Sequence, residues 1–238
     1  LQEFGTVLRH QLNEAHNAAT PVWPGGGRTT LTSEPDRETL ESFTIDDLRG
    51  VTHLALEHAT SPAEVVSIDL DSVSTLSQLV TRVDTASPRL SATLPAGDGA
   101  KFEITADAGW SIVGLAQETS DGTASPAVVE TTDASGRKRE FNFAHFFGFN
   151  NFTESTDGNP TAPAVRGDLA ADPQKIASAK LDVPGPGSDP FSVGGVGDSR
   201  GLGDLAAALD EPMDTVARGG LPDATVSARA YLSDVTSV

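Results

Sequence analysis

Apolar residues recur at every third or fourth position through residues 1–19 of the chain. The apolar face carries Leu1, Phe4, Leu8, Leu12, Ala15 and Ala19, and the opposite face carries Gln2, Glu3, Arg9, Glu14 and Asn17. This spacing predicts an amphipathic helix that ends at Thr20, before Pro21. Its apolar face needs a partner, and residues 224–238 also have helical spacing. We therefore expect these two segments to pack together at one end of the molecule.

Residues 50–143 follow a different pattern, in which apolar and β-branched residues alternate or run together. This pattern predicts β-strands, which we place at residues 51–56, 65–70, 89–94, 101–105, 111–115, 128–131 and 138–143. Between the second and third strands, Val73, Leu76, Leu79, Val80 and Val83 have helical spacing. We expect this helix to be capped by Ser72 or Ser74, to end before Pro88 and to lie across a β-rich module.

The remaining segments have weaker patterns. We expect residues 28–48 to be irregular apart from a helical turn near 38–43, and residues 153–163 and 182–201 to form loops. Asp172 and Pro173 predict the start of a short helix that ends at Ala179, and residues 202–209 predict another. The predicted fold class is α+β. A helical stem combines residues 1–30 and 192–238, and the β-rich inserted region, residues 36–190, carries one or two short helices.

Residues 141–152 hold six of the ten phenylalanines in the chain, and we call this segment the aromatic knot. Such rings bury a large apolar area, so they can dominate a core or an interface. We expect Phe146, Phe147 and Phe149 to be mostly buried, with Gly148 forming a tight turn between them. Two interpretations remain open: a core plug that holds a loop to the body, or a signature of a structural family.

Acidic residues outnumber basic ones by 34 to 16, which gives a net charge of −18. Nucleic acids and anionic membranes need a basic face, so neither is expected as a partner. The chain has no cysteine, which excludes disulfides, thiolate metal sites and a cysteine nucleophile. We also find no apolar run long enough to span a membrane.

Candidate chemistry is sparse. His10 and His16 are predicted on opposite faces of a helix, and His53 and His58 on opposite sides of a strand, so neither histidine pair has the spacing of a metal site. The glycine-rich segments 194–197 and 201–203 lack the Lys-Ser/Thr pair of a phosphate-binding loop, and no Gly-x-Ser-x-Gly segment is present. We therefore predict no catalytic residue, no cofactor and no metal site.

Five segments together resemble the flagellar hook-associated protein 1 family. They are Leu12-Asn-Glu-Ala-His16, Phe146-Phe-Gly-Phe-Asn150, Ala164-Val-Arg-Gly-Asp-Leu-Ala-Ala-Asp-Pro173, the Gly197-Asp198 segment that runs to Leu209, and the segment from Ala230 to Val238. Phe149 stands where the family usually has Leu. The residues that match the family motifs are Asn13, His16, Phe146, Phe147, Gly148, Phe149, Asn150, Arg166, Asp172, Pro173, Gly197 and Asp198.

The resemblance implies a non-catalytic structural subunit of the bacterial flagellum, located outside the cell at the junction between hook and filament. Its implied partners are other copies of itself in a ring, the hook protein and a second hook-associated protein. The family's terminal polymerising helices have no counterpart in this sequence. We therefore expect the chain to be the central part of such a subunit and to be monomeric on its own.

Other classes of protein stay open on the residues alone. A secreted β-rich binding or adhesin domain would place Trp23 or Trp110 beside an open groove. An acidic extracellular hydrolase would need carboxylates that converge in a pocket with raised pKa values. Within the flagellum, the alternatives are the hook protein and flagellin.

Overall fold

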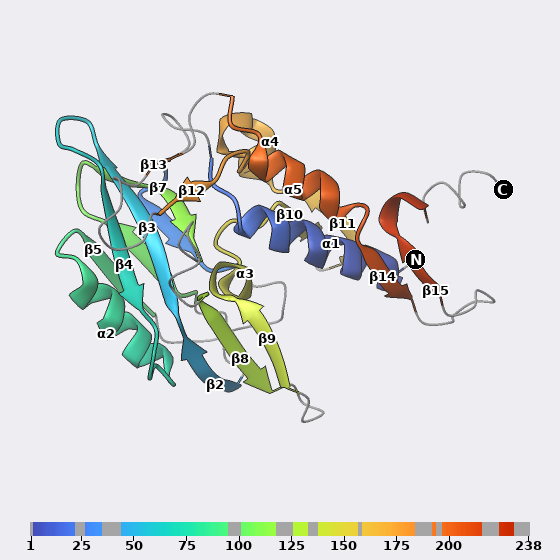
Figure 1. Ribbon diagram of the computed structural model, residues 1–238, viewed down its shortest axis with the longest axis horizontal. Helices are drawn as coiled ribbons and strands as arrows, with labels where there is room; N and C mark the ends of the chain where they lie inside the picture. The colour runs from blue at the N-terminus through green and yellow to red at the C-terminus, as the bar shows by residue number, and fades with distance from the viewer. Residues whose placement is uncertain are drawn as a thin grey trace.

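The computed structural model describes residues 2–21, 27–34, 44–94, 101–117, 126–132, 138–156, 159–183, 192–193, 197–215 and 224–230. It shows a β-rich body from which two helices extend side by side, α1 (Gln2–Asn17) and α5 (Arg200–Ala208) (Figure 1). The strands form small antiparallel sheets, and helices accompany them. The chain is therefore α+β, as predicted. Within the described residues, no helix is long and apolar enough to cross a membrane.

The body contains three sheets of three antiparallel strands each. The first has the order β4 (Glu64–Asp69), β3 (Val51–His58), β7 (Trp110–Ala116); the second, β1 (Thr30–Thr32), β6 (Glu103–Ala106), β5 (Leu90–Thr93); the third, β2 (Thr44–Arg49), β8 (Val128–Thr132), β9 (Lys138–Asn142). Helix α2 (Leu76–Ala86) packs against β4 and β5 and buries Leu79 and Val83. Most of the strands and α2 agree with the prediction. Two corrections are that the cap of α2 is Thr75 and that β1 and β2 form in a segment expected to be irregular.

One apolar core joins the body to the aromatic knot. Side chains of the strands, such as Leu54 and Ile104, share this core with Phe143, Phe146 and Phe147. The first two residues of the knot end β9, and a short helix, α3 (Phe143–Phe147), follows them and leads to the predicted turn at Gly148. The knot therefore belongs to the body, and its last residues lie at the C-terminal end of α1.

The stem differs from its prediction. The partner of α1 is α5, which runs antiparallel to it: Gly201 lies against Ala19, while Leu209 lies near Val7 and Leu8. The expected helix over residues 224–238 is wrong at its start, because β15 (Ala224–Ser227) pairs with β14 (Pro212–Thr215) in a hairpin, and helical residues begin only at Ala228. A four-residue segment such as Ala-Thr-Val-Ser is too short for its spacing to separate a strand from a helix, and the pairing with β14 decides. Residues 231–238 lie outside the described part of the chain.

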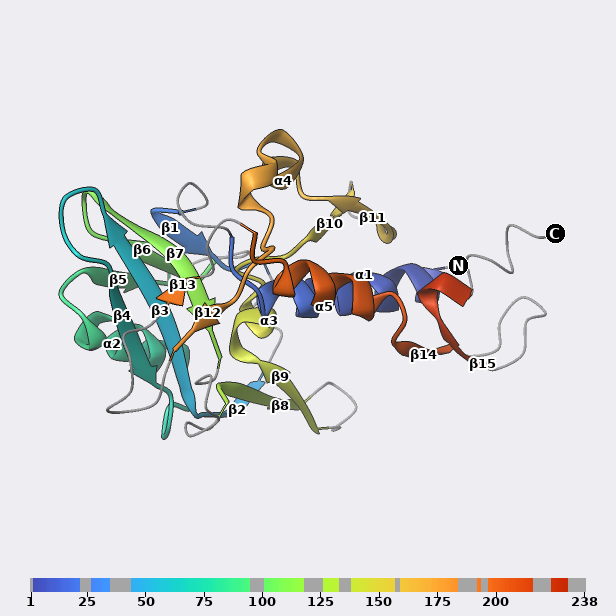
Figure 2. The same ribbon diagram turned by 45° about the horizontal axis from the view of Figure 1, so that its top comes forward.

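Two segments between the knot and α5 also differ from the prediction. The expected loop 153–163 is a hairpin, β10 (Thr153–Thr156) with β11 (Asn159–Val165), that packs along α1 (Figure 2). The helix expected to start at Asp172 comes earlier, as α4 (Gly167–Ala171), and Asp172 caps only the short 3-10 turn η2 (Pro173–Lys175). A two-residue ladder, β12 (Leu181–Asp182) with β13 (Ser192–Val193), precedes α5.

Candidate functional site: a polar joint at the base of helix α1

The most buried face of α1 is polar, contrary to the sequence prediction. Arg9, Asn13, His16 and Asn17 are buried, whereas the apolar residues Leu8, Leu12 and Ala15 are only partly buried. Packing explains the difference: the apolar side faces α5 and the β14–β15 hairpin, and the β10–β11 hairpin and the aromatic knot cover the polar side. Buried polar groups need partners, so the identity of those partners decides what this face does.

Asn13 connects α1 to the first residue of β10. Its Nδ2 donates to the Thr153 carbonyl oxygen at 3.1 Å, and its Oδ1 accepts from the Thr153 backbone N–H at 2.8 Å and from the Thr153 hydroxyl at 3.1 Å. The two residues are 140 positions apart in the chain. One buried amide thus satisfies both backbone groups of a residue at the strand end, as another strand would.

Asn17 connects the next turn of α1 to the end of the knot. Its Oδ1 accepts from the Asn150 backbone N–H, and its Nδ2 donates to Asn151 Oδ1, both at 2.8 Å. Asn150 in turn donates from its side chain to the His16 carbonyl oxygen at 3.1 Å, and Asn151 donates to the Glu34 carbonyl oxygen at 2.5 Å. The C-terminal carbonyls of α1 are therefore met partly by side chains of the knot.

The hydrogen bonds of His16 fix its tautomer. The Ala177 backbone N–H donates to Nε2 at 2.8 Å, so Nε2 carries no proton, and Nδ1 lies 2.5 Å from the Asn150 carbonyl oxygen, to which it donates. Burial lowers the pKa of His16 to about 4; the nearby charges of Arg28 and Arg166 act in the same direction, against the hydrogen bond to Asn150. The ring is neutral at pH 7 and joins three separate segments.

We call this set the polar joint: Asn13, His16, Asn17, Asn150, Asn151 and Thr153. The sequence analysis singled out Asn13, His16 and Asn150, and the structure brings these three together. It did not single out Asn17, Asn151 or Thr153. The signal for Asn17 was its place four residues after Asn13, on the same side of the helix.

The aromatic rings of the knot pack directly beneath the polar joint. Phe146, Phe147 and Phe149 are buried, in agreement with the prediction. The ring of Phe147 lies 5.4 Å from that of Phe149 in a stacked arrangement, and 5.0 Å from that of Phe146 in an edge-on one. Phe102 of the body contacts the same group, with its centroid 5.2 Å from Phe147. These rings make the base of the joint rigid.

Gly148 makes the turn that brings Asn150 and Asn151 to α1. Its φ of 65° lies in the left-handed region, and a Cβ at this position would lie 2.2 Å from the Glu34 carbonyl oxygen. The backbone of Glu34 also donates to the Phe147 carbonyl oxygen at 2.8 Å. Only glycine fits here, because both the conformation and the close backbone approach exclude a side chain.

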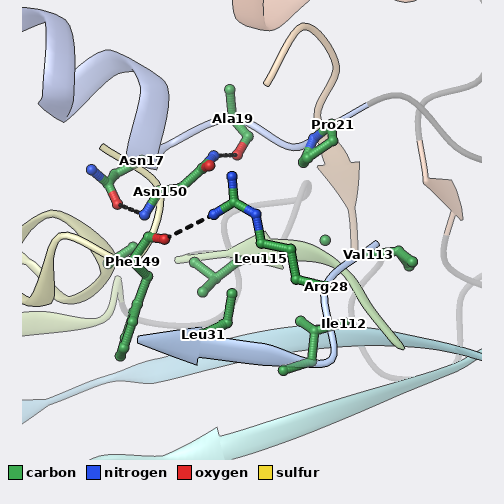
Figure 3. Close-up of a pocket in the computed structure, with 12 residues that line it drawn as sticks. Asn17, Ala19, Pro21, Arg28, Leu31, Ile112, Val113, Leu115, Phe149 and Asn150 are labelled. Carbon is green, nitrogen blue, oxygen red and sulfur yellow. Dashed lines mark hydrogen bonds between the residues drawn. The ribbon is translucent and has the colours of Figure 1, made fainter. Parts of the chain in front are cut away.

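A group of charges lies beside the polar joint. Arg166 forms two hydrogen bonds to Asp168, at 2.9 and 2.8 Å, and Arg28 lies 3.5 Å from the same carboxylate. Arg28 also donates to the Phe149 carbonyl oxygen at 3.2 Å, as Figure 3 shows. Burial raises the pKa of Asp168, but the hydrogen bond and charge of Arg166 outweigh burial and leave that pKa below its usual value. The charges are thus paired across the segments that meet at the joint.

The other residues of the family motifs lie in two further places. Asp172 caps η2 through a 3.3 Å bond from the Gln174 N–H, with Pro173 at the first position. Gly197 is exposed and has a φ of 98°. Asp198 accepts from the Lys180 and Arg200 backbone N–H groups at the start of α5, and hydrogen bonds from Arg200 lower its pKa to about 2. Arg166 is beside the polar joint, but these residues are not part of it.

The positions named for a hydrolase or a binding groove have other surroundings in the described part of the chain. A cavity of about 30 Å³ lies beside Arg28 and Asn150, with room for about one water molecule, and no carboxylate is among the residues described around it. Asp69 and Asp71 accept hydrogen bonds from backbone N–H groups of nearby turns. Trp110 is buried and stacks beneath the guanidinium of Arg89 at 4.1 Å, so it does not line an open groove. Trp23 lies outside the described residues.

No family model matches this chain. No curated protein matches it either. Three solved structures that resemble it are domains of the flagellar cap protein FliD.

The three structures can be compared in detail. The D2–D3 domains from Escherichia coli have 15% identity and a TM-score of 0.27, with 59% of this chain and 77% of that chain covered. The D2–D3 domains from Serratia marcescens have 14% identity and a TM-score of 0.25, covering 63% and 81%. The D1–D2–D3 domains from Escherichia coli have 11% identity and a TM-score of 0.27, covering 87% and 70%.

Proposed function

We propose that this chain is a structural subunit of the bacterial flagellum, that it lies at the junction between hook and filament, and that it acts through contacts between subunits. The observation that carries the proposal is the polar joint. Asn13 and His16 come from one motif that resembles the hook-associated protein 1 family, and Asn150 comes from another. Although more than 130 residues separate the motifs, His16 is hydrogen-bonded to the Asn150 carbonyl oxygen, and Asn13 is hydrogen-bonded to Thr153, three residues after the second motif.

A rigid joint suits a subunit that transmits torque outside the cell. The stem, residues 1–30 and 192–238, is the part that would face neighbouring subunits, and the inserted region, residues 36–190, would project into solvent. The net charge of −18 fits a solvated outer surface. The partners in this proposal are other copies of the chain in a ring, the hook protein and a second hook-associated protein.

The proposal is tested in the bacterium that carries the gene, by deletion and by immunogold electron microscopy of the tagged protein. We expect the deletion to leave hooks without filaments, and the label to lie where the hook ends. Label at the distal tip of the filament would assign the chain to a cap, and label along the filament would assign it to flagellin. Cells that keep normal filaments and swim would overturn a structural role in the flagellum.

Two exposed leucines provide a matched pair that tests the assignment of the faces. Leu202 lies on α5 in the stem, with 44% of its surface exposed, and Leu94 lies at the end of β5 in the body, with 37% exposed. Each substitution to Asp adds a charge in solvent and is expected to change the free energy of unfolding by less than about 0.5 kcal/mol. We expect Leu202→Asp to reduce the number of filaments per cell and Leu94→Asp to leave it unchanged. Equal numbers in the two strains would contradict the proposed orientation.

A further inference from the structure

Three residues with metal-binding side chains meet on the side of α1 that faces α3. His10 and Glu14 are one turn apart on α1, and His145 comes from α3, 135 and 131 positions later in the chain. Their ligand atoms all lie within 4.8 Å of one another. The two imidazole rings have centroids 4.4 Å apart and an interplanar angle of 49°.

The sequence analysis compared only histidines with one another and therefore missed this group. The local signal was the spacing of His10 and Glu14, since residues four apart on a helix lie on the same face. The third member could not be found locally, because it depends on how α3 docks on α1. None of the three belongs to the polar joint, and the proposed function gives them no role.

The surroundings favour a cation. The negative charge of Glu211 acts on Glu14, so a second carboxylate lies near the group. Phe141 forms an apolar wall, with its ring edge-on to both His10 and His145 at 6.1 and 6.2 Å between centroids. A bound divalent ion would offset the repulsion between the carboxylates and would be partly shielded from water.

The ligand set selects the kind of metal. Two imidazoles and one carboxylate are the donors of many zinc sites, whereas Ca²⁺ and Mg²⁺ prefer oxygen ligands alone. With Zn–N distances of about 2.0–2.1 Å, tetrahedral ligands lie about 3.3 Å apart. The atoms here must approach by somewhat more than ~1 Å, which the exposed side chain of Glu14 permits. A fourth position would remain for water or another ligand.

We propose that His10, Glu14 and His145 form a binding site for Zn²⁺ or a similar transition-metal ion. The ion joins α1 to α3. It therefore adds a second connection between the stem and the body. The site is independent of the proposed flagellar role, and its test does not require a flagellum.

The first test measures Zn²⁺ binding to the purified chain by competition with a chromophoric chelator. We expect one Zn²⁺ per chain, and a higher thermal unfolding midpoint with the ion present, because a ligand that binds only the folded state stabilises it. His10→Gln should weaken the affinity by at least about tenfold and abolish the shift in the midpoint, since it removes one of three ligands. His58→Gln is the matched control: His58 is also partly buried, packs on Trp110 and lies outside the group.

The second test uses Co²⁺ in place of Zn²⁺ and records its visible absorption, which reports the geometry of the ligands. The spectrum should indicate nitrogen and oxygen ligands in a low-coordinate site, and Glu14→Gln should change it. His145 is buried, so His145→Gln is informative only if circular dichroism shows that the chain is folded. Glu14 is exposed and His10 is only partly buried, so the Glu14→Gln and His10→Gln variants test the site without it. Failure of the wild-type chain to bind Zn²⁺, or unchanged binding in His10→Gln or Glu14→Gln, overturns the proposal.

Discussion

The two ends of α1 are held in different ways. At its C-terminal end, the polar joint pairs buried side chains with residues more than 130 positions away, directly above the stacked rings of the knot. At its N-terminal end, a small apolar cluster holds it, in which Ala228 is buried while Val7, Leu8 and Leu209 are only partly covered. Among the described residues, the C-terminal end carries the long-range hydrogen bonds of the polar joint, whereas the apolar cluster at the N-terminal end is small and only partly covered.

The difference indicates which end of α1 is held in a single position and which end can adjust its position. A buried polar group that loses its partner costs roughly 1–3 kcal/mol, so the polar joint permits only one register of α1 on the body. Partly covered apolar side chains can shift or become exposed to solvent at a much lower cost in free energy. The base of the stem should therefore unfold with the body, and the outer end should open first. The following changes test this contrast, starting with the largest expected effect.

Phe147→Ala removes a fully buried ring from the base. We expect a loss of about 3–5 kcal/mol in the free energy of unfolding, since both the transfer of the ring and the remaining cavity contribute. Urea denaturation followed by circular dichroism measures the loss. Phe141→Ala is the control, because Phe141 is only partly buried and should cost clearly less. A negligible effect of Phe147→Ala would mean that the base is not the rigid end.

Acid should weaken the polar joint through His16. Its pKa is about 4 in the folded chain and 6.5 in the reference state, so the unfolded chain binds more protons between these values. Stability is then fully present above pH 6.5 and decreases as the pH falls toward 4, by about 3 kcal/mol in total. The free energy of unfolding at pH 7 and at pH 4.5, both with a chelator present, measures the decrease.

One variant isolates the contribution of His16. His16→Gln should lower stability at pH 7 and reduce its dependence on pH in this window. A smaller dependence should remain, because burial also lowers the pKa of His53. If His16→Gln retains the full pH dependence, the protonation of His16 does not open the joint.

Asn13→Ala leaves both backbone groups of Thr153 without their side-chain partner. We expect a loss of roughly 2–3 kcal/mol and faster hydrogen exchange of the Thr153 amide. The control is Ala18→Asn, which places the same amide at an exposed position just beyond the helix and should change stability by less than about 0.5 kcal/mol. Similar losses in both variants would remove the distinction between buried and exposed polar groups.

Leu209→Ala acts at the outer end of the stem and should have the smallest effect. Because Leu209 is only partly buried, we expect a loss of about 1 kcal/mol, with faster hydrogen exchange limited to the first turns of α1 and the β14–β15 hairpin. Hydrogen exchange with mass spectrometry shows where protection is lost. Loss of protection across the polar joint would show that the two ends of α1 are coupled.

Much of the fold follows from local pattern. Helices α1, α2 and α5 and the strands from β3 to β9 have apolar spacing that already indicates their type. The β10–β11 hairpin does not, because β10 is entirely polar and β11 contains Pro160 and Pro163; in the structure the hairpin packs along α1. For β15, four residues fit a helix or a strand equally well, and the pairing with β14 decides.

The candidate site was predicted only in pieces. Motif resemblance singled out Asn13, His16 and Asn150, but their meeting depends on tertiary contacts across more than 130 residues. The face of α1 that is most buried was assigned to solvent, because polar residues usually face water. The partners of His16 are the Asn150 carbonyl oxygen and the Ala177 N–H. Both are backbone groups, and no side-chain pattern reveals them.

Because the tautomer of His16 is fixed, the NMR signals of its ring report whether the polar joint is intact. A proton held on Nδ1 against the Asn150 carbonyl oxygen is shielded from solvent, so it should give a resolved downfield resonance in the NMR spectrum of the chain. The two ring nitrogens should also differ widely in ¹⁵N shift, one protonated and the other accepting from Ala177. A single labelled histidine would thus show whether the stem remains seated on the body as subunits come together.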